Sequence, residues 1–138
     1  MKKLVFVLLT LVTFNVTAQL VVKEAAKDTV IWQLSKLNPV PKLVRFKLED
    51  VESYTIYYKN AQYTAITDID YISIGDSTTT RQFFELCKQV IAEDKEYNVE
   101  LDNKDISLRK TLGTVMIYTS GSYFYLSDKN LTAILERL

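Results

Sequence analysis

Histidine is absent from this chain of 138 residues, and its absence excludes several common reaction mechanisms. Ser-His-Asp and Cys-His hydrolysis, His-ligated zinc or haem, and a histidine pH switch all require an imidazole. What remains is chemistry run by carboxylates, by Lys or Tyr, or by a Ser-Lys pair. The sequence therefore favours a non-enzymatic protein, and it predicts neither a cofactor nor a metal site.

Cysteine, glycine and proline are also scarce. The only cysteine, Cys87, cannot form an internal disulfide, and it falls in an apolar helical stripe where a reactive thiolate is disfavoured. The three glycines are isolated from one another and cannot build a phosphate-binding loop. The 17 basic and 17 acidic residues balance, so charge gives no argument for a nucleic-acid or anionic-membrane partner.

The first eighteen residues have the order typical of a secretory signal peptide. Lys2 and Lys3 come before an apolar run at residues 4–14, and the small residues Val16 and Ala18 follow it. The run is shorter than the roughly 20 residues that cross a bilayer. The pattern is similar to a bacterial Sec signal, which implies cleavage after Ala18 and export to a periplasm or the extracellular space. An uncleaved N-terminal anchor is the alternative; after cleavage we expect no membrane span.

After residues 1–18, the sequence divides into an N-terminal segment at residues 19–42 and a single predicted α+β domain at residues 43–138. In the N-terminal segment, residues 23–27 favour helix, whereas residues 30–34 fit either a strand or a continued helix. Apolar and polar residues alternate from residue 43 onwards. This alternation predicts strands at residues 43–49, 53–58, 63–67 and 71–74.

Two amphipathic helices are predicted in the domain. Asp76 has the short polar side chain of a helix N-cap, and Ser127 or Asp128 can cap the second helix in the same way. The apolar stripe of the first helix consists of Phe83, Leu86, Cys87, Val90 and Ile91. The stripe of the second consists of Leu131, Ile134, Leu135 and Leu138. Each helix is therefore expected to pack one face against a sheet.

Two hairpins are expected between these helices. A turn at residues 103–104 would place Leu101 opposite Ile106, and a second turn is expected at residues 120–121. Together these elements predict an α+β fold in two layers. An antiparallel sheet of about six or seven strands would carry both helices on one face.

The sheet face away from the helices supplies the candidate binding surface. The turn at residues 120–121 puts Tyr118 opposite Tyr123, and Met116 opposite Tyr125, on that face. Tyrosine offers a large contact area with few rotatable bonds and one polar tip, which suits recognition of a partner. The alternative is ordinary packing of these side chains beneath the N-terminal segment. We therefore predict an exported module that binds or assembles with another protein through Met116, Tyr118, Tyr123 and Tyr125.

Two other functions stay open in the sequence. A carboxylate-dependent hydrolase or carbohydrate-acting protein would use Asp68, Asp70 or Glu100, and it would need two carboxylates about 5–10 Å apart. A structural subunit of an envelope complex is the other alternative. Asp68 and Asp70 could also hold a cation, but the glycine and distal glutamate of a calcium loop do not follow them. We interpret both as turn residues.

Overall fold

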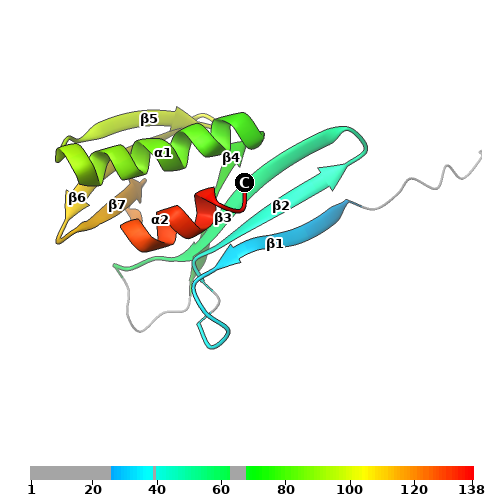
Figure 1. The fold of residues 1–138 in the computed structure, drawn as a ribbon, viewed down its shortest axis with the longest axis horizontal. Coiled ribbons are helices and arrows are strands. Elements are labelled where there is room, and N and C mark those ends of the chain that lie inside the picture. Colours follow the sequence, from blue (N-terminus) through cyan, green and yellow to red (C-terminus); the bar gives the residue numbers. More distant parts are fainter. Residues whose placement is uncertain (1–25, 39, 63–67) are drawn as a thin grey trace, which may run out of the picture.

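The computed structural model describes residues 26–38, 40–62 and 68–138. The signal peptide predicted at residues 1–18 and the strand predicted at residues 63–67 lie outside these ranges. Within the ranges, the chain forms two four-stranded antiparallel sheets, and each sheet is followed by a helix (Figure 1).

The two halves of the described chain have the same order of elements. Sheet A has the strand order β1-β2-β3-β4, with β1 (Lys27–Gln33), β2 (Lys42–Leu48), β3 (Val51–Lys59) and β4 (Ile69–Gly75). Helix α1 (Ser77–Glu93) comes next. Sheet B has the order β5-β6-β7-β8, with β5 (Tyr97–Leu101), β6 (Lys104–Thr111), β7 (Thr114–Thr119) and β8 (Ser122–Ser127). Helix α2 (Asp128–Leu135) follows β8.

The predicted α+β class is confirmed, but the prediction of one larger sheet is wrong. The eight strands in the described ranges are divided equally between two sheets, with α1 between them in the sequence. Alternation of apolar and polar residues shows which side chains of a strand share a face, but it does not determine which strands pair. Neighbouring strands pair within each half, whereas β4 leads into α1 at Asp76 and does not pair with β5.

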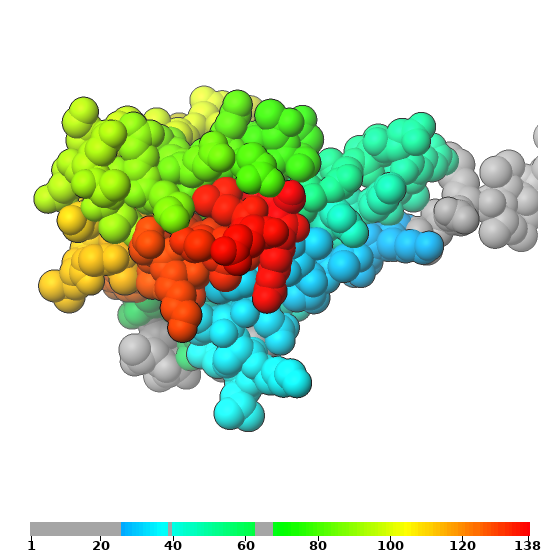
Figure 2. All heavy atoms as spheres, viewed as in Figure 1, coloured from blue at the N-terminus to red at the C-terminus, as the bar shows by residue number. Residues whose placement is uncertain are grey.

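Both helices pack against strands and against each other. Helix α1 contacts strands of both sheets (β3, β4, β6 and β7), whereas α2 contacts β8 of sheet B and β1 of sheet A. Figure 2 shows α2, in red, lying against α1, in green, and beside β1, in blue. Fully buried side chains from both sheets and both helices form one hydrophobic cluster, which includes Ile56, Ile72, Phe84, Leu108, Ile117 and Leu131. The two sheets therefore share a single core.

The helix caps predicted from the sequence are confirmed. The Asp76 carboxylate accepts a hydrogen bond from the Thr79 backbone N–H at 2.8 Å, and Ser127 Oγ accepts one from the Asn130 N–H at 3.2 Å. Phe84 is fully buried, although the predicted stripe left it out. Because α1 packs against α2 as well as both sheets, its buried face is wider than a single sheet would require.

The predicted register of the first hairpin in sheet B is wrong by two residues. Its turn is formed by Asp102 and Asn103, one residue earlier than expected, so Val99 rather than Leu101 lies opposite Ile106. Both turn residues have left-handed backbone angles, with φ of 50° and 58°, which Asp and Asn adopt more readily than most residues. A shift of two residues keeps every side chain on its predicted face.

Residues 30–33, which the sequence left open between strand and helix, belong to β1. Trp32 is the buried residue of this strand, and the pairing with β2 is irregular between Val30 and Trp32. An edge strand with one buried side chain and an irregular register shows no clear alternation. The sequence pattern therefore could not identify it.

Candidate functional site

The predicted binding residues lie together on the outer face of sheet B. We call Met116, Tyr118, Tyr123 and Tyr125 the Tyr surface. The predicted register is confirmed, since Tyr118 lies opposite Tyr123 and Met116 lies opposite Tyr125. Tyr118 and Tyr125 are each 41% exposed, and the other two are half-buried. Their immediate neighbours along β7 and β8 are mostly buried, so the four side chains share the face away from the core.

A cavity of about 290 Å³ adjoins the Tyr surface on its β6 side. Its lining residues are Ser107, Arg109, Met116 and Tyr118. Ser107 Oγ donates a hydrogen bond to Asn98 Oδ1 at 2.7 Å, and an Arg109 guanidinium nitrogen lies 3.2 Å from Glu96 Oε1. These interactions position the polar wall of the cavity, while Met116 and Tyr118 supply an apolar wall.

Strand β8 forms one edge of sheet B, and part of that edge is already paired. The Ala61 backbone N–H, just beyond β3, donates to the Tyr123 carbonyl oxygen at 2.8 Å, and the Tyr123 N–H donates to Asn60 Oδ1 at 3.3 Å. Both backbone groups of Tyr123 therefore point away from β7. Because this direction repeats at every second residue of a strand, the backbone groups of Tyr125 also point outward from the edge.

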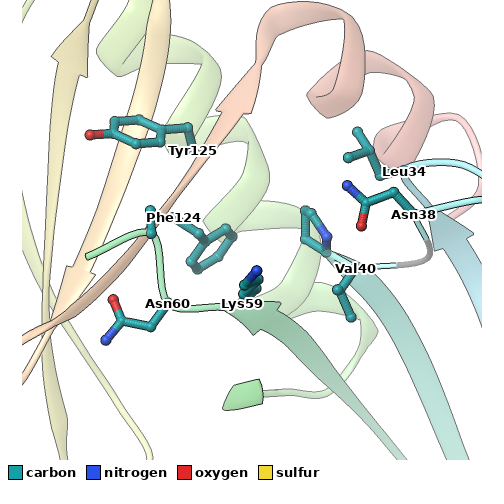
Figure 3. Close-up of a pocket in the computed structure, with 9 residues that line it drawn as sticks. Leu34, Asn38, Val40, Lys59, Asn60, Phe124 and Tyr125 are labelled. Atoms are coloured by element: carbon teal, nitrogen blue, oxygen red, sulfur yellow. The ribbon is translucent and has the colours of Figure 1, made fainter. Parts of the chain in front are cut away.

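The edge at Tyr125 borders a pocket of about 410 Å³ between β8, the end of β3 and the β1–β2 loop (Figure 3). The pocket is lined by Leu34, Asn38, Val40, Pro41, Lys59, Asn60, Ala61, Phe124 and Tyr125. In Figure 3 the Tyr125 ring extends away from Leu34 and Asn38, so its backbone borders the pocket. Among the described residues, no backbone hydrogen bond connects Tyr125 to the β1–β2 loop. Within the described ranges, the backbone groups of Tyr125 are therefore free to pair with an added strand.

No family model, curated protein or solved structure matches this chain. Neither α1 nor α2, the two helices of the described ranges, is long and apolar enough to cross a membrane. Function is therefore inferred from the geometry of the site.

The carboxylates predicted for the alternative hydrolase do not line one pocket together. Asp70 lines a pocket of about 150 Å³, whereas Asp68 and Glu100 are exposed and are not among the residues that line it. Glu100 lies opposite Asp105 on the outer face of sheet B. Within the part of the chain that the structure describes, no three His, Cys, Asp or Glu side chains form a cluster suited to a metal ion.

Cys87 lies in the buried face of α1, as its place in the apolar stripe predicts. The side chain has no exposed surface, and burial raises the pKa of the Cys87 thiol well above its ordinary range. The thiol therefore stays protonated and shielded from solvent. Cys87 is a core residue and is not activated as a nucleophile.

Sequence reasoning missed the pocket beside β8. Leu34, Asn38 and Val40 belong to the segment whose structure the sequence left open. Asn60 lies between the strands predicted at residues 53–58 and 63–67. The pocket forms where sheet A meets sheet B, between residues far apart in the sequence, so no local pattern indicates it. The one available signal is Asn60, because a loop asparagine readily bonds to a neighbouring backbone.

Proposed function

We propose that this protein is exported to a periplasm or the extracellular space. There it works as a non-enzymatic module that binds an extended segment of a partner protein. The basic, apolar and small residues at positions 1–18 support export. The absence of histidine supports a role in binding rather than catalysis. No nucleic acid or cofactor is part of this proposal.

The backbone edge at Tyr125, which is unpaired within the described residues, is the observation that carries this proposal. A partner strand can pair with exposed N–H and C=O groups of an edge strand, while its alternate side chains enter pockets beside that strand. At β8 the pocket lined by Val40 and Phe124 lies beyond the edge, and the Tyr surface lies on the adjoining outer face. A bound segment would therefore gain main-chain hydrogen bonds and aromatic contacts at the same place.

The pocket lining also indicates the chemistry of the segment. Val40, Pro41 and Phe124 give the pocket apolar walls that suit an aliphatic or aromatic side chain. Lys59 is the charged residue among its described lining residues, and it favours an acidic neighbour on the bound segment. We therefore expect the partner sequence to place an apolar residue close to Asp or Glu.

Selection from a displayed library of random peptides, with the purified protein as bait, tests the proposal. We expect enrichment of extended peptides that carry an apolar residue near an acidic one. A selected peptide should shift the backbone amide NMR signals of Tyr123 and Tyr125. Replacing both Tyr118 and Tyr125 by Ser should weaken its binding about tenfold or more, because exposed aromatic anchors dominate contacts of this kind.

Tyr71→Ser is the matched control for the double replacement. Tyr71 is 53% exposed, like the replaced residues, but it lies on β4 of sheet A. Its replacement should leave peptide affinity unchanged, and circular dichroism should show that all variants are folded. Equal losses in the control and the double variant, or NMR shifts confined to surfaces away from β8, would overturn the proposal.

A further inference from the structure

A second pocket, polar in character, lies where sheet A meets the turn end of sheet B. Its volume is about 150 Å³, and its walls come from β3, β4, the start of β6 and the β7–β8 turn. Three hydroxyl groups, those of Tyr58, Thr119 and Ser122, form its buried part. Asp70 and Lys104 lie at its exposed part. The pocket is separate from the Tyr surface, and it shares none of that surface's four residues.

The buried hydroxyls have hydrogen-bonding capacity left over. Tyr58, Thr119 and Ser122 are 1%, 5% and 7% exposed, and Ser122 Oγ donates to the Tyr58 hydroxyl oxygen at 2.9 Å. The Tyr58 proton therefore remains available to a further acceptor. Burial, the largest influence, raises the pKa of Tyr58, so the hydroxyl keeps that proton.

Thr119 Oγ1 is the unexplained group in this pocket. It is buried and has no hydrogen-bond partner among the described residues. A buried hydroxyl without a partner is unfavourable, and nearly all such groups in native proteins are satisfied by protein, water or a ligand. Thr119 lies opposite Ser122 in the β7–β8 pairing and lines the same pocket as the Tyr58 and Ser122 pair. The pocket therefore carries two hydroxyl groups whose protons are not donated within the described residues.

The two charged residues of the pocket are not paired with each other. Lys104 Nζ lies 4.9 Å from the centre of the Tyr71 ring, and neither Lys104 nor Asp70 takes part in an ion pair among the described residues. One positive and one negative group thus face a single small pocket while both remain available. A ligand with both charges would match them better than a simple anion or cation.

We propose that this pocket binds a small zwitterion with the chemistry of a free amino acid. The ligand carboxylate accepts hydrogen bonds from the buried hydroxyls and lies near Lys104, while its ammonium group lies near Asp70. The size is suitable, because a cavity of about 150 Å³ can hold a ligand as large as a benzene ring. Glycine and alanine are smaller than that limit and carry both charged groups.

Isothermal titration calorimetry and NMR titration of the purified protein test this proposal. The probes are glycine and L-alanine, with acetate and ethylamine as ligands that carry one charge each. We expect saturable binding of both zwitterions, with affinities at least about tenfold higher than those of acetate or ethylamine. The NMR shifts should be centred on Thr119, Ser122 and Asp70.

Variants of the exposed residues make the test specific. Lys104→Met should weaken zwitterion binding by about tenfold, and Asp70→Asn should weaken glycine binding while leaving the weak binding of acetate unchanged. Lys129→Met, at an exposed position of α2, is the matched control and should bind as the parent protein does. Thr119→Val should also weaken binding, provided that circular dichroism shows a folded protein.

Three results would overturn the proposal. The first is the absence of saturable heat or NMR shifts with either zwitterion, which would leave water as the partner of Thr119. The second is acetate or ethylamine binding as tightly as glycine. The third is unchanged glycine affinity in both Lys104→Met and Asp70→Asn, because the two charged groups would then take no part in binding.

Discussion

The ring of Tyr58 on β3 stacks on the ring of Phe124 on β8, with centroids 4.2 Å apart and an interplanar angle of 19°. This contact joins sheet A to sheet B next to the hydrogen bond between Ala61 and Tyr123. Phe124 lines the pocket beside β8, and Tyr58 lines the polar pocket at the turn end of sheet B. One aromatic pair therefore positions both candidate sites and links the two halves of the core.

We predict that Phe124→Ala destabilises the protein strongly. The replacement removes a 3% exposed ring from the junction between the sheets, so the free energy of unfolding should fall by about 3–5 kcal/mol. Urea denaturation followed by circular dichroism measures this change. The neighbouring Tyr125→Ala is the control, because its side chain is 41% exposed and should cost about 1 kcal/mol or less. Similar losses in both variants would show that the stack does not hold the sheets together.

Cys87 provides a second prediction, on chemical reactivity. The thiol has no exposed surface, and burial raises its pKa, so a disulfide reagent should not label it in native buffer. Labelling should increase with urea in parallel with global unfolding. Helix α1 contacts α2 and both sheets, so its buried face, which carries Cys87, becomes exposed only when the whole fold opens. Lys129→Cys, in a Cys87→Ala background, should react at once. Rapid labelling of Cys87 in native buffer would contradict the packing of α1.

Local sequence signals predicted individual helices and hairpins of this fold better than they predicted how the strands are divided between sheets. Asp76 and Ser127 identify the helix starts because capping depends on one side chain and the next three residues. The turn at Ser120 and Gly121 likewise determines the register of β7 and β8, and with it the Tyr surface. These features need no information from distant parts of the chain.

The division into two sheets could not be predicted in the same way. It depends on contacts between β3 and β8, such as the Tyr58 and Phe124 stack, that link residues far apart in the sequence. Both pockets form at this junction, so both escaped prediction although Asp70 and Tyr125 were already candidates. Residue types indicated which side chains could act, whereas tertiary structure decides which neighbours they have.

Asp76 gives a prediction on pH dependence. Its carboxylate accepts the Thr79 backbone N–H, and this hydrogen bond holds the pKa of Asp76 below its ordinary value of 3.8. Because the folded-state pKa is lower than the unfolded one, the carboxylate stabilises the fold fully above pH 3.8. That contribution is lost as the pH falls through the folded-state pKa.

Asp76→Asn tests this prediction because asparagine still caps the helix but does not titrate. The stability of the variant should fall less than that of the parent between neutral pH and pH values below 3.8, as measured by urea denaturation at each pH. Asp50→Asn, in the exposed β2–β3 turn, is the control for removal of a carboxylate. Parallel pH profiles for the parent and Asp76→Asn would show that the cap is not linked to pH.

The β6–β7 turn offers a stabilising replacement. Leu112 is 99% exposed and has a left-handed backbone angle, φ 48°, directly before Gly113. Leucine is poorly suited to this conformation, whereas Asn-Gly is the preferred pair for such a two-residue turn. Leu112→Asn should therefore raise the free energy of unfolding by about 1 kcal/mol, measured by urea denaturation.

Leu37→Asn separates this backbone effect from the removal of an exposed apolar side chain. Leu37 is also 99% exposed, but it is not among the residues with positive φ. Its replacement also removes an exposed leucine side chain, but it relieves no left-handed backbone strain. The free energy of unfolding should therefore change by less than about 0.5 kcal/mol. If the two variants gained equal stability, the strain at Leu112 would not be the cause. If only Leu112→Asn gained stability, the left-handed turn at residues 112–113 would be the source.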